Sequence, residues 1–291
     1  MAPRNLTKGA RRRVERWIRD NVSGDFMEKL RNVSTPRNEF GVDPFGFDPE
    51  YLMWSIPLIH FLYRHYFRTS AHGTEKVPAG PVLLVANHSG QIPVDGMMMG
   101  GSMLLDADPP RMLRSMVERW VPTLPFISVF MARCGQVLGT PENCRRLLRS
   151  GEAILVFPEG ARGISKTFDQ RYQLQEFGFG FMRLALESGA PIVPVAVIGG
   201  EEQAPSFHNA KSLARLLGMP AFPITPTFPW VPVVGMLPYP VRYRLWFGDP
   251  MRFEGDPDED DTVIGAKVAR VKQALKGLID HGLEEREAIF W

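Results

Sequence analysis

A histidine and an aspartate lie close together in the run from Asn87 to Asp95, which reads Asn-His-Ser-Gly-Gln-Ile-Pro-Val-Asp. A neutral imidazole accepts a proton from an alcohol when its other ring nitrogen is held as a hydrogen-bond donor, and a carboxylate bound to that nitrogen stabilises the imidazolium that forms. Asp95 can supply that bond while His88 faces a substrate. The pair therefore indicates general-base chemistry on a hydroxyl, although an isolated pair of this kind is more often structural.

A second charged segment, Pro158–Gly163, follows the apolar run Ala153–Phe157. Gly160 permits a close approach of backbone to a ligand. Arg162 can hold phosphate or carboxylate oxygens with two hydrogen bonds. Glu159 can accept a hydrogen bond from a hydroxyl, or it can pair with Arg162. This segment predicts an anion-binding site that faces the loop of the histidine.

Apolar runs precede both segments and predict the strands that position them. Val82–Ala86, Ala153–Phe157 and Ile192–Ile198 lack the polar alternation of a half-exposed sheet, so we expect them to be buried on both faces. In α/β folds the loops at the carboxyl ends of such strands hold the chemistry. Helical patterns lie at Pro141–Ser150, Phe177–Ser188 and Thr262–Ile279, and Tyr243–Phe247 is a further strand that could lie at an edge. The alternation predicts an α/β fold, a mainly parallel or mixed sheet flanked by helices.

The start of the chain is strongly basic. Up to residue 19 there is a single acid, Glu15, against seven basic side chains, namely Arg4, Lys8, Arg11, Arg12, Arg13, Arg16 and Arg19. An anionic membrane surface attracts such a segment by about 1 kcal/mol for each basic residue near it. A solvated basic terminus is the alternative. No apolar run follows closely enough for a secretory signal peptide.

Two further segments bear on membranes. Residues 9–31 have a helical pattern, and the turn-rich connector Asn32–Pro49 leads to an aromatic helix near residues 50–67. The apolar part of this helix, Tyr51–Tyr63, is shorter than the roughly 20 residues that a spanning helix needs, so we expect it to lie in a membrane interface. Residues 1–68 are thus predicted to form a basic segment with amphipathic and aromatic membrane-surface helices, and residues 69–291 the α/β domain.

The stretch Leu216–Val241 has no charged side chain but contains seven prolines. Backbone exposed to lipid must satisfy its own hydrogen bonds, which so many prolines prevent in a single helix, so this stretch is not expected to span a membrane. Its aromatic residues suit a surface loop that reaches the headgroup region, and packing over the protein's own core is the alternative.

Composition excludes several classes of protein. The chain of 291 residues is 44% hydrophobic and 23% charged, as expected of a globular protein. A net charge of +2 is too small to indicate nucleic-acid binding. The cysteines, Cys134 and Cys144, form no disulfide framework and have no second ligand at metal-binding spacing, which favours a reducing compartment. No metal site is expected.

The charged segments together resemble the glycerolipid acyltransferase family, whose best-known members acylate lysophosphatidic acid. His88 with Asp95 resembles the family's catalytic block, and Phe157–Arg162 resembles its acceptor-binding block Phe-Pro-Glu-Gly-x-Arg. The resemblance implies that Glu159 and Arg162, together with the glycine between them at position 160, contact the acceptor.

Two more blocks extend the resemblance. Arg133-Cys-Gly135 is similar to the intervening block, in which an arginine lies beside the acceptor, and this implies an acceptor-binding role for Arg133. Ile192–Ala196 is similar to the apolar proline-containing strand that closes the series. The order and spacing of the blocks agree over Val77–Gly200, a little under half of the chain.

The family mechanism fits the chemistry expected from the residues. His88, oriented by Asp95, would deprotonate the acceptor hydroxyl, which attacks an acyl thioester of coenzyme A or acyl carrier protein as co-substrate, with no other cofactor. No covalent acyl-enzyme is implied, in agreement with the lack of a Gly-x-Ser-x-Gly elbow in the sequence. Ser89 is therefore expected to be a turn residue rather than a nucleophile.

The sequence departs from the family pattern in two places. Six residues separate the histidine from the aspartate where the family usually has four, and this loop resembles a divergent branch that includes diacylglycerol acyltransferase-like proteins. Phosphate-handling members also carry a basic residue just before a glycine after the second block, where this chain has Glu176 before Phe177-Gly178. Lys166 and Arg171 are the candidates to compensate as acceptor-binding cations.

We therefore expect an O-acyltransferase for a lysophospholipid or glycerol-phosphate type acceptor, peripheral or monotopic at the cytoplasmic side of a membrane. Its partners would be an acyl donor, in some cases on acyl carrier protein, a lipid acceptor and anionic membrane lipids, and not nucleic acid. One alternative is a neutral or unusual alcohol as acceptor, such as diacylglycerol, a wax alcohol or a glycan. The other is a non-catalytic lipid-binding protein on the same fold.

Overall fold

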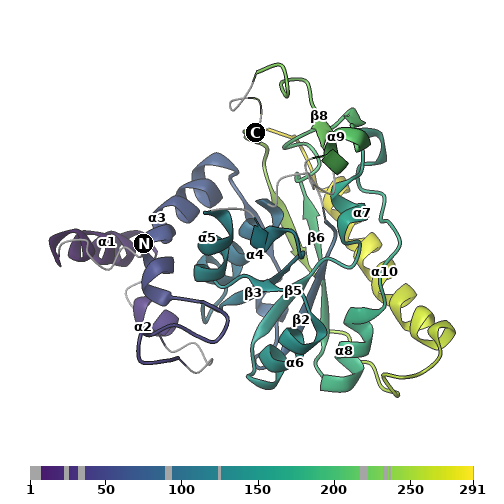
Figure 1. Cartoon of the computed structure of the whole chain (residues 1–291), viewed down its shortest axis with the longest axis horizontal. Coiled ribbons are helices and arrows are strands. Elements are labelled where there is room, and N and C mark those ends of the chain that lie inside the picture. The colour runs from purple at the N-terminus through teal and green to yellow at the C-terminus, as the bar shows by residue number, and fades with distance from the viewer. Residues whose placement is uncertain are drawn as a thin grey trace.

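The computed structural model describes residues 8–22, 26–31, 37–88, 94–123, 126–216, 222–231, 235 and 237–290. Within this part of the chain a seven-stranded sheet has the order β1-β9-β6-β2-β5-β3-β4 (Figure 1). The strands are β1 (Ser70–His72), β2 (Val82–Ala86), β3 (Leu113–Val117), β4 (Val137–Leu138), β5 (Ala153–Val156), β6 (Ile192–Ile198) and β9 (Arg244–Phe247). All neighbouring strands are parallel except β6 and β9, so the predicted α/β class is confirmed and the sheet is mixed.

The central strands β2 and β6 are buried along their whole length, as their apolar sequences predict. Successive side chains of a strand point to opposite faces of the sheet. Leu83 and Val85 accordingly pack in one core cluster, and Val82 and Leu84 pack in another. The sheet therefore has two apolar faces, and each face requires a layer of helices.

The helices divide between these two faces. Helices α6 (Pro141–Arg149), α8 (Gly180–Ser188) and α10 (Asp261–Glu284) contribute to the cluster that contains Leu83. Helix α4 (Val94–Leu105) and the π-helical turn η2 (Leu62–Tyr66) contribute to the cluster on the opposite face. In Figure 1 the sheet accordingly lies between α8 with α10 on one side and α4 on the other.

Strand β9 is not at an edge of the sheet, so the edge position considered for Tyr243–Phe247 is wrong. It lies between β1 and β6, and Leu245 and Phe247 are buried. Its antiparallel ladder with β6 ends where Gly248 N–H donates to the carbonyl of Pro194 at 2.8 Å. Proline has no N–H to return that bond. Pro194 therefore pairs with this segment through its carbonyl alone.

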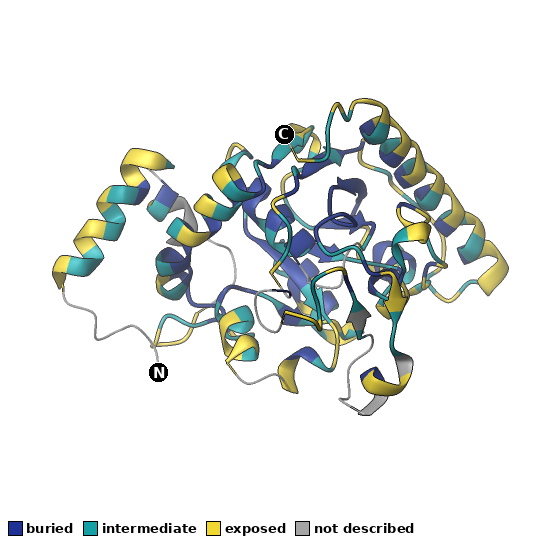
Figure 2. Cartoon of the chain, turned by 90° about the horizontal axis from the view of Figure 1, so that it is seen from above, coloured by how far each residue is buried: buried dark blue, intermediate teal, exposed yellow. Residues whose placement is uncertain are grey.

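The N-terminal helices form a third cluster beside the sheet. The helical stretch predicted over residues 9–31 consists of α1 (Lys8–Asn21) and α2 (Phe26–Arg31), and the aromatic helix is α3 (Pro49–Phe61), followed by η2. Asp48 caps α3 by accepting hydrogen bonds from the N–H groups of its first turn. Figure 2 shows that α1 exposes most of its surface. The predicted boundary after residue 68 stays a prediction.

Short elements complete the described chain. They are η3 (Thr74–Lys76), η4 (Val121–Thr123), α5 (Ile127–Arg133), α7 (Ala161–Ile164), η5 (Phe168–Gln170), β7 (His208–Asn209), α9 (Lys211–Leu216) and β8 (Pro223–Ile224). Among the residues that the structure describes, no helix is both long and apolar enough to cross a membrane. The stretch Leu216–Val241 includes β8 and turns, while its residues 217–221, 232–234 and 236 lie outside the described part, as do residues 32–36 of the connector.

Candidate active site

The structure brings His88 and Asp95 into direct contact despite the six residues between them. His88 follows the carboxyl end of β2, Asp95 is the second residue of α4, and the distance from His88 Nδ1 to Asp95 Oδ2 is 2.6 Å. The Asp95 side chain is fully buried, whereas that of His88 is 13% exposed. Because a carboxylate accepts, Nδ1 is assigned as the donor, which leaves Nε2 as the basic nitrogen. Ser89 lies outside the described residues, so its expected place in a turn stays a prediction.

Two further contacts hold this pair in place. Asp95 Oδ1 accepts a hydrogen bond from the Gly96 N–H at 2.7 Å, so both carboxylate oxygens are engaged. The His88 ring stacks on that of Phe157, with centroids 4.2 Å apart and planes inclined by 17°. Phe157 directly follows β5, the neighbour of β2. The ring is therefore held by groups from α4 and from the loop after β5.

Glu159 engages backbone rather than facing an open site. Its Oε1 accepts from the His88 N–H at 3.0 Å, and its Oε2 accepts from the Gln175 N–H at 2.8 Å. The residue is 1% exposed. In the same loop, a Cβ added to Gly163 would lie 2.8 Å from His88 Cβ, so the two segments are in close contact. The structure supports a positioning role for Glu159, and its contact with an acceptor stays a prediction.

Lys166 is buried behind this loop. Its Nζ lies 2.9 Å from Glu201 Oε1 and 3.6 Å from Glu159 Oε2, and its side chain is 2% exposed. Burial raises the pKa of Glu201, and the charge of Lys166 opposes that shift. The ammonium group is thus paired with carboxylates inside the protein.

A buried polar group that the sequence analysis missed lies beside Lys166. Tyr172 donates its hydroxyl to Glu202 Oε2 at 2.5 Å, and the same hydroxyl accepts from the Gly199 N–H at 2.9 Å. Arg286, just after α10, pairs with Glu202. Burial and the neighbouring Glu202 raise the pKa of Tyr172 well above its usual value. The sequence does contain a sign of this group. Glu201 and Glu202 follow the carboxyl end of β6, where α/β folds place functional side chains.

Arg162 and Arg171 lie at the surface. Arg162 Nη1 is 2.9 Å from Glu176 Oε2, so its partner is not Glu159, and the two side chains are 55% and 81% exposed. Arg171 donates to the carbonyl of Phe168 at 3.3 Å and lies over that ring. An acceptor contact by either arginine stays a prediction.

Gly160 has a positive φ angle, a backbone conformation that favours glycine. Its φ is +55°, in the region that side chains with a Cβ rarely adopt. A Cβ at this position would lie 3.3 Å from Glu118 Oε1. The glycine thus allows the loop after β5 to approach the segment after β3.

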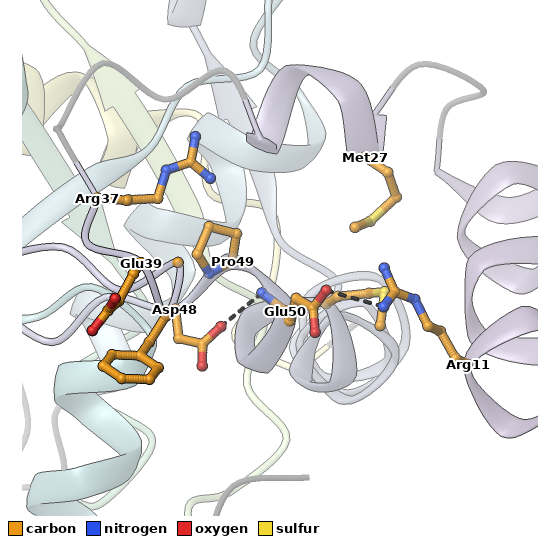
Figure 3. Close-up of a pocket in the computed structure, with 10 residues that line it drawn as sticks. Arg11, Met27, Arg37, Glu39, Asp48, Pro49 and Glu50 are labelled. Carbon is orange, nitrogen blue, oxygen red and sulfur yellow. Dashed lines mark hydrogen bonds and ion pairs between the residues drawn. The ribbon is translucent and has the colours of Figure 1, made fainter. Parts of the chain in front are cut away.

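Arg133 bonds to the N-terminal helices. It ends α5, its Nη1 is 2.9 Å from Asp48 Oδ2, and its guanidinium lies over the Tyr51 ring. Its predicted place beside an acceptor stays a prediction. Asp48 also borders a cavity of about 580 Å³, which Figure 3 shows between α1 and the start of α3. The cavity is lined by Arg11, Met27, Arg37, Glu39, Phe40, Gly41, Asp48, Pro49, Glu50 and Met53.

Comparisons with known proteins relate this sequence to other chains. A family model described as Acyltransferase matches residues 68–198, which include both loops of the site. An uncharacterized protein of Mycobacterium tuberculosis (strain ATCC 25618 / H37Rv) is 38% identical over 259 residues, covering 87% of this chain and 72% of that protein. A Gallus gallus protein named DGAT1/2-independent enzyme synthesizing storage lipids is 26% identical over 205 residues, covering 70% and 58%.

A solved structure shares the fold. The crystal structure of the 1-acyl-sn-glycerophosphate (LPA) acyltransferase PlsC from Thermotoga maritima matches with a TM-score of 0.51 and 15% sequence identity. The match covers 96% of this chain and 97% of that chain. The mixed sheet flanked by helices is therefore an arrangement that the two proteins share.

Proposed function

We propose that this chain, which belongs to the acyltransferase family, transfers a fatty acyl group from a thioester to a hydroxyl of a glycerolipid acceptor, with His88 as the general base. The observation that carries the proposal is the 2.6 Å contact between His88 Nδ1 and Asp95 Oδ2. In the neutral ring this contact makes Nδ1 the donor and leaves Nε2 as the nitrogen that can accept a proton from an alcohol.

The transfer proceeds by direct attack. The acceptor oxygen attacks the thioester carbonyl carbon while His88 Nε2 takes the hydroxyl proton. The new C–O ester bond forms, the C–S bond breaks, and the imidazolium returns its proton to the departing thiolate. Asp95 stabilises the imidazolium between these steps. The thiol carrier is coenzyme A or acyl carrier protein.

The chain is proposed to act at a membrane surface. Leu58 and Phe61 are exposed on α3, and Phe126 at the start of α5 is 88% exposed. Contact between the rings of Tyr51 and Phe130 joins these two helices. Exposed apolar side chains on helices that contact one another are typical of surfaces that meet lipid or protein. The neighbouring α1 exposes basic side chains, namely Lys8, Arg12, Arg13, Arg16 and Arg19, which would face anionic headgroups.

Catalysis is tested with the purified full chain, radiolabelled acyl-CoA and a panel of lipid alcohols. We expect ester formation by the wild type and its loss in His88→Ala. His65→Ala, which removes an exposed histidine, is the control and should retain activity. Undiminished transfer by His88→Ala would contradict the assigned base, and no transfer by the wild type with any donor and acceptor would contradict the enzymatic function.

Membrane binding is tested by flotation with anionic liposomes. Phe126→Asp places a charge in the exposed apolar surface and should reduce the floated fraction. Val263→Asp makes the same change at an exposed position of α10 and should leave flotation unchanged. Equal flotation of both variants and the wild type would exclude this surface of α5 as a membrane contact.

A further inference from the structure

The ion pair between Arg162 and Glu176 adjoins the candidate catalytic histidine. Arg162 precedes Gly163, whose added Cβ would meet His88 Cβ at 2.8 Å. The Arg162 guanidinium is the exposed cation of this loop, and its Nη1 is 2.9 Å from Glu176 Oε2. An acceptor phosphate that binds Arg162 would therefore meet the Glu176 carboxylate.

Glu176 is held in this position by its neighbours in the chain. The preceding residue, Gln175, donates its N–H to Glu159 Oε2 at 2.8 Å. Two residues later, the Gly178 N–H donates to the carbonyl of Pro158 at 2.9 Å. Both acceptors belong to the loop that carries Arg162. The backbone on each side of Glu176 is thus tied to the arginine's own loop, which keeps the carboxylate within reach of the guanidinium.

Lys166 does not supply a replacement for Arg162. Lys166 is buried and paired with Glu201 at 2.9 Å. Glu118 approaches the same loop at Gly160, 3.3 Å from the position of an added Cβ. The cation of this loop is therefore neutralised, and a second carboxylate borders it.

We propose that Glu176 is a specificity-determining residue that excludes phosphorylated acceptors, so that the acceptor is an uncharged glyceride. This inference rests on the acyl transfer proposed above and replaces the phosphorylated acceptor expected from the sequence. Repulsion between two unit charges about 4 Å apart lowers affinity by about fivefold even in bulk water, and by more where water is excluded. An uncharged hydroxyl compound avoids this repulsion and can hydrogen-bond to both members of the pair.

The test compares two acceptors in vesicles of phosphatidylcholine, with oleoyl-CoA as donor. We expect the wild type to acylate dioleoylglycerol at a higher kcat/KM than oleoyl lysophosphatidate. Glu176→Gln should raise kcat/KM for the lysophosphatidate by about fivefold or more through a lower KM. The same variant should change kcat/KM for the uncharged acceptor by less than about twofold, since that acceptor carries no charge for the carboxylate to repel.

A matched control and a second variant test whether the change in acceptor preference arises at the pair of Arg162 and Glu176. Glu187→Gln removes the same charge from another surface pair, Arg145 with Glu187 at 2.8 Å, and should leave the ratio of the two acceptors unchanged. In an Arg162→Gln background, Glu176→Gln should give a higher KM for the lysophosphatidate than Glu176→Gln alone, because the guanidinium that would bind the phosphate is missing.

The possible failures are distinguishable. A wild type that prefers the lysophosphatidate, or a folded Glu176→Gln whose acceptor ratio equals that of the wild type, would overturn the role of Glu176 while acyl transfer stands. Transfer to neither acceptor by any variant would contradict the proposed function, and this inference with it. Far-ultraviolet circular dichroism and thermal unfolding show whether each variant is folded before its rates are compared.

Discussion

The backbone N–H of His88 donates a hydrogen bond to Oε1 of Glu159 at 3.0 Å. The two residues are 71 positions apart in the chain, but each follows one of two adjacent parallel strands, in which Val85 pairs with Val156. The other oxygen of Glu159 accepts from the Gln175 N–H. One buried carboxylate thus sets the backbone position of the proposed base and anchors the segment that carries Glu176.

Glu159→Gln is expected to lower both stability and kcat. A glutamine has one acceptor oxygen, so its amide group would face one of the two backbone N–H donors and leave it unsatisfied. We expect a loss of about 1–3 kcal/mol in the free energy of unfolding, measured by urea denaturation. A fall in kcat with little change in KM would show that His88 is displaced. Full kcat in the folded variant would contradict the positioning role.

Asp95→Asn tests the carboxylate itself. The amide no longer stabilises the imidazolium and can favour the wrong tautomer, so kcat should fall by about 10²- to 10⁴-fold. Acceptor KM should change little, because Asp95 is fully buried. Asp249→Asn, at an exposed carboxylate that pairs with Lys76, serves as the control. A fall of less than threefold in the Asp95 variant would remove this residue from the mechanism.

Gly163→Ala should impair catalysis through a steric effect. The added Cβ would lie 2.8 Å from His88 Cβ and 3.1 Å from Glu159 Cβ, so one segment must move. A displacement of about 1 Å at a catalytic group can lower the rate by roughly 100-fold. Gly277→Ala, in α10, places its Cβ in open space and should leave kcat unchanged. Equal rates for the two variants would show that the loop yields without moving the histidine.

Arg114→Met should destabilise the contact between the N-terminal segment and the sheet. Arg114 on β3 and Asp43 in the connector are fully buried and form an ion pair at 2.5 Å. Removal of one partner leaves the other charge buried, which costs about 3–5 kcal/mol. Arg145→Met breaks a surface pair that water screens, so it should lower the free energy of unfolding much less than Arg114→Met does. Urea denaturation of the two variants makes the comparison, and similar losses would refute the argument.

The two cysteines should react slowly in the folded protein. Burial raises the pKa of Cys134 and of Cys144 from 9.0 to about 11. Iodoacetamide at pH 8 should therefore modify the native chain far more slowly than the urea-unfolded chain, because the thiolate is the nucleophile. Mass spectrometry of quenched samples measures both rates, and comparable rates would mean that the thiols are accessible.

The same shift predicts the sign of a pH effect. Above pH 9 the unfolded chain releases the protons of these two thiols, while the folded chain retains them. The stabilisation that comes from the neutral buried thiols is therefore fully present below pH 9 and is lost as the pH rises towards 11. The double variant Cys134→Ala, Cys144→Ala should show a smaller loss of stability over this range in urea denaturation. An identical loss in the double variant and the wild type would contradict the shift.

Local patterns in the sequence were sufficient for much of the fold. The runs Val82–Ala86 and Ile192–Ile198 predicted β2 and β6 to the residue, because strands covered on both faces are continuously apolar. Helix α6 begins at Pro141 as predicted, because Thr140 caps it and proline is favoured in the first turn, and it ends at Arg149, one residue before the predicted Ser150. The candidate pair His88 and Asp95 was found by its position after a strand.

Only the tertiary structure shows which strands pair with β9 and which charged side chains pair with one another. Nothing within Tyr243–Phe247 specifies that it pairs with both β1 and β6, because strand order depends on contacts between distant segments. Glu202 pairs with Arg286, which is 84 positions away in the chain. Arg162 pairs with Glu176 and not with Glu159, which is nearer to it in the sequence. The sequence by itself determined the strands β2, β5, β6 and β9, the helices α6, α8 and α10, and the chemical groups of the site, whereas the sequence analysis did not predict β1, β3 and β4. Only the tertiary structure decided which charges neutralise one another, because ion pairing depends on distances of a few ångströms that the loops set together.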